Sequence, residues 1–168
     1  MDEGQSRSGF GKTIQTIITM SDSIQINVSI EAINELRFLM AEPNLLPSGD
    51  ITGQLQFNQL LETEIDKTHH KVIVNAGAKY ALPEQTLCEL VINVVFSLEP
   101  FDSIIKIDPD QRTISFAAEF IPTLLNVAYG TLRGILAAKT KDTPLAAYPL
   151  QMVQMEELTK MNRFRVKE

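Results

Sequence analysis

The segment from Phe120 to Leu150 constrains the fold more than any other part of this sequence. Pro122 suits the first turn of a helix, where its missing N–H is not needed. Apolar residues then recur at spacings of three and four, which is typical of one buried helix face. Thr143-Pro144 ends the helix, because the residue before a proline is driven out of helical geometry. We therefore expect one long helix, an apolar proline-interrupted loop over 145–152, and a second short helix over 153–162.

Most of the chain before this helix alternates between apolar and polar residues, which is the pattern of half-buried strands. The alternation predicts strands at 24–40, 51–61, 71–82 and 86–98. The short links between the last three favour antiparallel neighbours. The apolar phase of the first strand slips near Ala32–Glu35, which indicates a bulge. The predicted fold is therefore α+β: a four-stranded antiparallel sheet covered by a long C-terminal helix and a short final helix.

The ends of the chain and one connection are expected to be irregular. Residues 1–20 start polar and glycine-containing, so they are expected to form a flexible leader, although 13–19 also reads as an added edge strand. Residues 21–168 are expected to form one domain, within which 101–107 and 112–116 make a small hairpin. The basic end, KMNRFRVKE, is expected to be solvated and frayed.

Charge and cysteine content exclude several function classes. A formal net charge of −6 argues against nucleic acid, because phosphates demand a basic surface. The single cysteine, Cys88, excludes an intrachain disulfide and a cysteine-based metal cluster, which fits a cytoplasmic protein. No secretory signal is visible, and no apolar run is expected to be long enough to cross a bilayer, so membrane insertion is not expected.

The titratable residues do not form a recognisable catalytic or metal-binding motif. His69 and His70 are adjacent in an expected turn, so their side chains should diverge rather than share a metal. Cys88 alternates with apolar neighbours and should pack as a small hydrophobe; the competing interpretation is a nucleophilic thiol. Gly11-Lys12-Thr13 resembles the end of a phosphate-binding loop, but Ser6 stands where its first glycine should be. We expect a binding protein without catalytic activity, cofactor or metal.

The loop after the first strand carries an apolar pair, Leu45-Leu46, between prolines. Either the pair tucks back onto the core or it lines a binding surface, since contiguous exposed apolar area usually has a purpose. Both readings remain open from the sequence.

Several short motifs occur in a specific order. They are Leu36-Arg37-Phe38 with Glu42-Pro43-Asn44, then Thr86-Leu87-Cys88-Glu89-Leu90, then Phe120-Ile-Pro-Thr-Leu-Leu with Ala128-Tyr129, and finally Ala147-Tyr148-Pro149-Leu150-Gln151-Met152. Together, from about Ile24 to Leu158, this series resembles the SecB protein-export chaperone family. The chain departs from the family pattern at Asn126-Val127-Ala128-Tyr129, at Leu39, where an acidic residue is expected, and in its basic tail.

The resemblance implies a cytoplasmic, ATP-independent holdase, a homotetramer arranged as a dimer of dimers, that binds unfolded polypeptides in apolar grooves. The client-binding candidates that it implies are Leu45, Leu46, Phe57, Leu145, Tyr148, Leu150 and Met152. Contact with the export ATPase SecA, which the family makes through the outer face of the sheet, would rest on Glu35, Leu87 and Glu89. The alternative is a dedicated interaction or assembly module that uses the same fold for one fixed partner.

Small residues on the predicted long helix bear on the tetramer. Without bulky side chains at these positions, a partner helix can approach closely; the residues are Ala128, Gly130, Gly134, Ala137 and Ala138. They would equally allow the helix to pack closely on the sheet of its own subunit.

Overall fold

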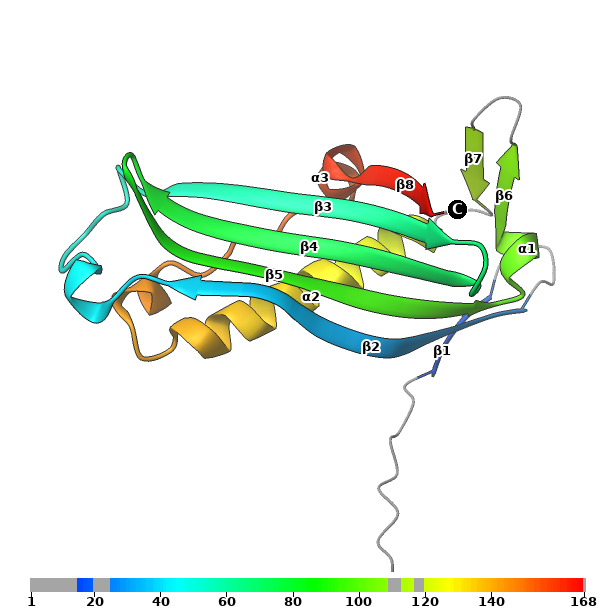
Figure 1. The fold of residues 1–168 in the computed structure, drawn as a ribbon, viewed down its shortest axis with the longest axis horizontal. Coiled ribbons are helices and arrows are strands. Elements are labelled where there is room, and N and C mark those ends of the chain that lie inside the picture. The colour runs from blue at the N-terminus through cyan, green and yellow to red at the C-terminus, as the bar shows by residue number, and fades with distance from the viewer. Residues whose placement is uncertain (1–14, 20–24, 109–112, 117–119, 168) are drawn as a thin grey trace, which may run out of the picture.

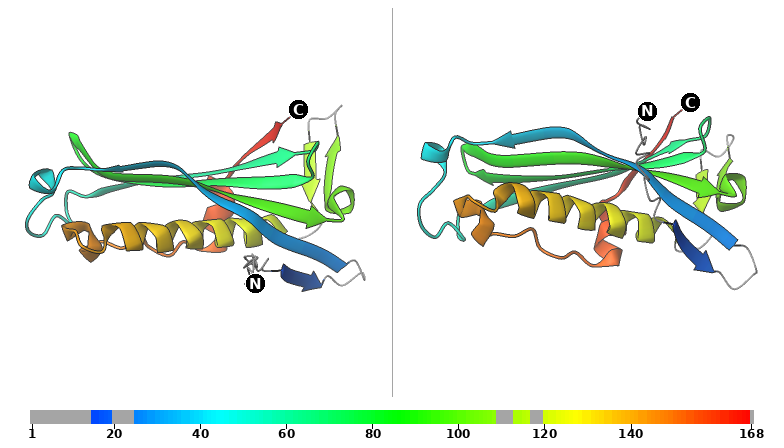
Figure 2. Two further views of the ribbon diagram at one scale, coloured as in Figure 1. Left: turned by 60° about the horizontal axis from the view of Figure 1, so that its bottom comes forward. Right: turned by 90° about the horizontal axis from the view of Figure 1, so that it is seen from below.

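The computed structural model describes residues 15–19, 25–108, 113–116 and 120–167. Its main sheet has six strands in the order β1-β2-β5-β4-β3-β8 (Figure 1). Their bounds are β1 Gln15–Thr19, β2 Gln25–Met40, β3 Gln56–Asp66, β4 Lys71–Leu82, β5 Gln85–Glu99 and β8 Arg163–Lys167. A long helix, α2 (Phe120–Thr140), lies against one face of this sheet (Figure 2). The predicted α+β class, with an antiparallel sheet covered by a long helix, is confirmed.

The four central strands are the predicted ones, and they pair antiparallel. The register of β2 against β5 shifts between Ile30 and Ala32 and again between Glu35 and Arg37, so the slip in the apolar pattern did mark a bulged stretch. The third strand begins later than predicted, because residues 52–54 form a turn in which Thr52 bonds to the Asp50 carboxylate. β3 also runs on to Asp66, into the expected link.

Both edges of the sheet carry an additional strand. β1 pairs with β2 along Gln25–Ser29, as the edge-strand interpretation of 13–19 predicted. The rest of the expected leader, residues 1–14 and 20, lies outside the described residues. At the other edge, β8 pairs parallel with β3 over Glu62–Asp66. The expectation of a frayed basic tail is therefore wrong for Arg163–Lys167, because backbone and charge partners on β3 hold this segment.

The segments around the long helix follow the predicted order. α2 ends at Thr140, and the Thr143 hydroxyl accepts a hydrogen bond from the N–H of Leu145, which caps the short helix η2 (Pro144–Ala147). An extended segment then returns to α3 (Met155–Met161). The expected hairpin is formed by β6 (Ile105–Asp108) and β7 (Thr113–Phe116). Its first arm is shorter than predicted, because Phe101–Ile104 form the short helix α1.

Strand register separates two faces of the sheet. We call the face toward α2 the inner face; it carries cross-strand rows such as Leu61–Ala76–Ile92. These residues join the helix in one hydrophobic core. The opposite, outer face is more polar, and a Cβ at Gly77 would lie only 3.3 Å from Val91 Cγ2 and 3.4 Å from Leu60 Cβ, so the outer side chains close over this glycine.

α2 is long and apolar enough, by length and composition, to cross a membrane, which corrects the expectation that no segment reaches that length. Nine of its side chains are buried in the protein, and this packing accounts for the apolar character of that side of the helix. Its other side is exposed at Asn126, Gly130, Gly134, Ala137 and Ala138.

Candidate functional site

The first candidate surface lies on β2, where exposed apolar side chains gather beside an unpaired strand edge. We call Ile33, Leu36, Phe38 and Leu39 the β2 patch; all four are exposed. β1 covers β2 only along Gln25–Ser29, so among the described residues the edge from Ile30 to Met40 has β5 on one side and no strand on the other. Exposed apolar area beside free backbone groups is the typical setting for adding an extended partner.

The inner-face members of the β2 patch lie beside the end of α2. Ile33 pairs with Val94 and Phe38 with Leu90, so both share the face that the helix covers. Lys139, near the end of α2, places its Nζ 4.1 Å from the centre of the Phe38 ring and 2.8 Å from Glu35 Oε2. The methylene stem of this lysine and its charged head thus border the apolar patch on the helix side.

A second exposed apolar surface lies on the β3 side of the helix. We call Phe57, Met152 and Met155 the β3-side patch; Met152 is 82% exposed. Phe57 and Gln59 share the inner face of β3, and Gln59 Nε2 donates to the Tyr129 hydroxyl at 2.8 Å. That hydroxyl donates in turn to the carbonyl of Gln151 at 3.0 Å, which fixes the segment that presents Met152.

Two loops far apart in sequence meet at one end of the sheet. The Tyr148 hydroxyl accepts the backbone N–H of Ile51 at 3.0 Å and lies 3.3 Å from Asp50 Oδ1. Hydrogen bonds from Thr52, and to a smaller extent from Tyr148, hold the pKa of Asp50 below its ordinary 3.8. The loop between β2 and β3 and the proline-containing loop, which both carry predicted client-binding residues, therefore lie together.

The structure divides the predicted client-binding residues into two groups. Leu45, Phe57 and Met152 are exposed, and Leu46 and Tyr148 are partly buried against the core. Leu145 and Leu150 are buried in the core, 1% and 5% exposed, so they cannot present an apolar surface as predicted. The two readings of the apolar pair each hold for one residue, since Leu46 tucks inward and Leu45 faces solvent.

The predicted translocase-contact residues do not share one surface. Leu87 is fully buried, with its carbonyl accepting the N–H of Ala41 at 2.8 Å. Glu35 lies on the inner face, where it pairs with Lys139, so its expected place on the outer face is wrong. Glu89 does lie on the outer face, 3.3 Å from Arg37 Nη2. Of the three predicted translocase-contact residues, only Glu89 is partly exposed on the outer face that the resemblance implies for this contact.

The β2 patch contains functional candidates that sequence reasoning did not select. Leu36 and Phe38 fit the apolar alternation of a half-buried strand and were not among the predicted site residues. Their exposure follows from the edge position of this half of β2. The slip in the apolar pattern near Ala32–Glu35 was the sequence signal of an irregular strand here.

The titratable candidates behave as structural groups. Burial raises the pKa of the Cys88 thiol to about 11, which keeps it protonated at neutral pH and disfavours a nucleophilic role. His69 bonds to Asp66, while the His70 ring stacks on Phe101 with 5.0 Å between centroids, so the two histidines diverge as expected. Within the part of the chain that the structure describes, no group of three or more His, Cys, Asp or Glu side chains is placed to hold a metal.

Asp66 supports the turn between β3 and β4 in a pH-dependent way. Its carboxylate accepts the backbone N–H of His69 at 3.0 Å and the ring Nδ1–H at 2.9 Å. Chiefly the ring hydrogen bond, and then the backbone one, lower the pKa of Asp66 from 3.8. Because the folded pKa is the lower one, this stabilisation is present above about pH 3.8 and is lost as the pH falls through the lowered value.

We therefore expect Asp66→Asn to lower the free energy of unfolding by about 1.5 kcal/mol at neutral pH, as for a hydrogen bond to a charged group. The difference from the unmodified chain should shrink below about pH 3.8, where the carboxyl protonates in the unfolded chain. Urea denaturation at neutral and acid pH measures this, with Asp142→Asn at an exposed position as control. A difference that stays constant with pH would contradict the assignment.

Comparison with known proteins finds no matching family profile and no curated protein sequence with significant similarity. Among solved structures, the chain is similar to a SecB-like chaperone of Mycobacterium tuberculosis in complex with a peptide from an antitoxin. The two chains are 17% identical, and the match covers 76% of this chain and 90% of that chain with a TM-score of 0.44. The bound peptide is a feature of the mycobacterial complex.

Proposed function

We propose that this protein is an ATP-independent holdase that binds unfolded polypeptides on the apolar surfaces beside α2 and has no catalytic activity. The observation that carries the proposal is the β2 patch, in which four large apolar side chains stand exposed along an unpaired strand edge. The β3-side patch adds a second apolar surface on the opposite side of the helix.

The two kinds of contact on β2 suit partners of many sequences. Apolar burial is non-directional and contributes about 25 cal/mol per Å², so a few client side chains can offset the cost of ordering an extended segment. The free N–H and C=O groups of the edge can add strand-like hydrogen bonds, which depend on backbone rather than on side-chain identity. The flexible side chains of Met152 and Met155 allow the β3-side patch to adapt to different partners.

The finer features of the proposal are carried from the sequence resemblance. The protein would act in the cytoplasm as a homotetramer, with the exposed side of α2 as a contact between copies. Delivery to the export ATPase SecA would rest on Glu89, since Glu35 faces the helix and Leu87 is buried.

The test is the refolding of a model protein in the presence of the purified chain. We expect a stoichiometric amount to delay refolding, and the double variant Leu36→Ser/Phe38→Ser to lose at least about tenfold in client affinity, because two apolar contacts of more than about 1 kcal/mol each disappear. Leu60→Ser is the matched control, since Leu60 is similarly exposed but lies on the outer face.

An unmodified chain that causes no delay would contradict holdase function. A panel of unrelated unfolded proteins then separates the holdase from the dedicated interaction module, because a holdase retains most of the panel and a dedicated module retains one member or none.

A further inference from the structure

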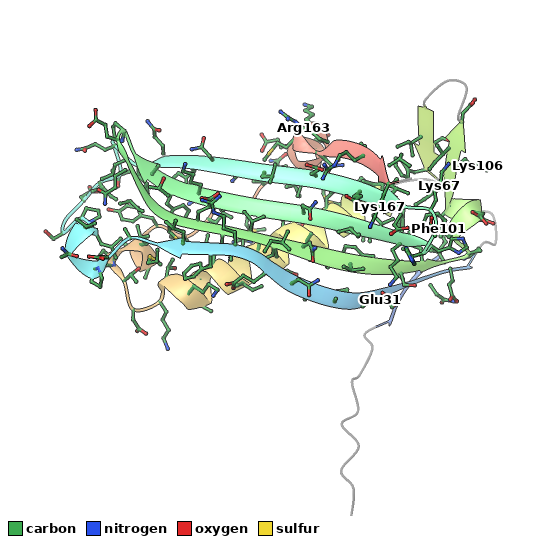
Figure 3. All side chains as sticks on the ribbon, viewed as in Figure 1. Glu31, Lys67, Phe101, Lys106, Arg163 and Lys167 are labelled. Carbon is green, nitrogen blue, oxygen red and sulfur yellow. The ribbon has the colours of Figure 1, made fainter. Side chains whose placement is uncertain are left out.

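The strand β8 provides the evidence for a further binding surface, which is independent of the β2 patch and the β3-side patch. β8 runs parallel to β3, with Arg163 opposite Glu62, Arg165 opposite Glu64 and Lys167 opposite Asp66. Three basic side chains are thus in register with three acidic ones, all on the outer face. Figure 3 shows Arg163 and Lys167 along this edge of the sheet.

The acidic and basic side chains differ in how they are held. With β8 in place, the side chains of Glu62, Glu64 and Asp66 are only 20%, 21% and 7% exposed. Those of Arg165 and Lys167 are 64% and 56% exposed. Arg165 pairs with both glutamates and Lys167 Nζ lies 3.6 Å from Asp66 Oδ2. The acidic row belongs to β3, which is also paired with β4 along its other edge, and the basic row of the edge strand β8 lies on top of it.

β8 is held by its strand pairing and by exposed ion pairs to β3, without a buried side chain of its own. All five of its residues are exposed, including Phe164 and Val166 on the inner side. The Phe164 ring does contact the Phe116 ring of β7, with 5.2 Å between centroids. The contact that anchors α3 to β3 lies outside β8. The Thr63 hydroxyl donates to Oδ1 of Asn162, the residue just before β8, at 2.9 Å. An element with no buried side chain opens more readily than the core does.

Opening of β8 would leave a defined binding surface. The outward N–H and C=O groups of Glu62–Asp66 would lose their strand partner. Glu62 and Glu64 would lose Arg165, and Asp66 would lose Lys167 but keep its contact with His69. Such an edge fits one kind of ligand: an extended segment, parallel to β3, with basic residues at alternate positions. An apolar or aromatic residue after the first basic one would meet the Phe116 ring, as Phe164 does.

We propose that the β3 edge from Glu62 to Asp66 is a docking surface for an extended polypeptide segment with alternating basic and apolar residues, and that β8 is a resident ligand which such a segment displaces. The evidence for it is the registered charge complementarity of the two strands together with the absence of any buried side chain in Arg163–Lys167. The apolar patches beside α2 take no part in it.

The probe for the test is a labelled peptide with the sequence of the strand itself, NRFRVKE. We compare its binding to the unmodified full chain and to the full-length variant Arg163→Glu/Arg165→Glu/Lys167→Glu, whose β8 is repelled by the acidic row. The variant should bind the peptide about tenfold more tightly, because a site occupied by a tethered competitor has its affinity reduced by the fraction that is open. Equal or weaker binding by the variant would overturn the proposal.

Two further arms identify the contacts. Adding Glu62→Gln/Glu64→Gln to the charge-reversed variant should abolish the gain, and a peptide of the same composition with its basic residues contiguous should bind weakly. Full binding of either would mean that general charge attraction, not a registered strand, holds the peptide. Leu36→Ser/Phe38→Ser in the same background should bind the peptide normally, which separates this site from the holdase surface.

Light scattering identifies the source of the strand. If charge reversal of β8 leaves the molar mass unchanged and the peptide binds, β8 belongs to its own chain and the surface accepts an external segment. A fall in mass would show that β8 joins two copies, which would overturn the assignment to an external partner. Circular dichroism confirms that the charge-reversed chain stays folded; its unfolding would overturn the premise that β8 opens more readily than the core.

Discussion

Replacing Leu132 with alanine is expected to lower the free energy of unfolding by about 3 kcal/mol, a large part of the stability of a domain of this size. Leu132 lies near the middle of α2 and is fully buried in the core that joins the helix to the sheet. Truncation removes the transfer free energy of its buried methyl groups and leaves a cavity that rigid strands cannot close. Urea denaturation followed by circular dichroism, at one fixed protein concentration, measures the change.

Asn126→Ala is the matched control on the same helix, because Asn126 is exposed. Its effect should stay within about 0.5 kcal/mol. If Leu132→Ala were equally mild, the helix would not be packed on the sheet in solution as the structure has it.

Replacing Gly134 with leucine is expected to break the proposed tetramer and at least halve the molar mass in light scattering. A glycine inside a helix costs about 1 kcal/mol relative to alanine. Among the described residues, no atom outside the local helix backbone lies within 4 Å of a Cβ built at Gly134. The protomer therefore gains no contact from this glycine, whereas a helix of a second copy could approach closely there. A leucine side chain would occupy that space.

Two comparisons make this result interpretable. Glu157→Leu adds the same apolar bulk at an exposed position of α3 and should leave the mass unchanged. Gly134→Ala in a chain that proved monomeric should raise the free energy of unfolding by about 0.5–1 kcal/mol, since only the helix propensity changes. A tetramer that tolerates leucine at position 134 would contradict a contact at this face.

Local patterns were sufficient to predict the central sheet and the helices α2 and α3. β4 was predicted with its observed bounds and β5 to within one residue, because both strands bury one complete face and so alternate along their length. The end of α2 is marked by Thr143-Pro144, whose effect on the backbone is local and does not depend on the rest of the fold.

β8 could not be predicted in the same way. RFRVK buries no side chain, and the acidic residues that pair with it lie about a hundred positions earlier in the sequence. Basic residues at the end of a chain are usually solvated, so composition pointed to a tail. The strand is defined by its register with β3, which is a non-local property.

The candidate site was predicted in part, for a related reason. Leu45 and Met152 are exposed as a binding surface requires, whereas Leu145 and Leu150 are core residues in equally apolar, proline-rich sequence. Composition identifies such a loop but does not show which of its side chains turn inward. Burial of Leu87 also depends on tertiary packing, because strand alternation alone places it opposite Cys88.

The register shifts of β2 have a consequence for self-association. They divide its unpaired side into short regular stretches, Ala32–Glu35 and Arg37–Met40, which are interrupted where Glu31 and Leu36 stand out of register. An incoming chain can match the hydrogen-bond spacing of one stretch but not of both in a straight line. Growth of a continuous cross-β fibre needs many uninterrupted pairings. The interrupted edge of β2 therefore disfavours fibre formation, although it is apolar and unpaired.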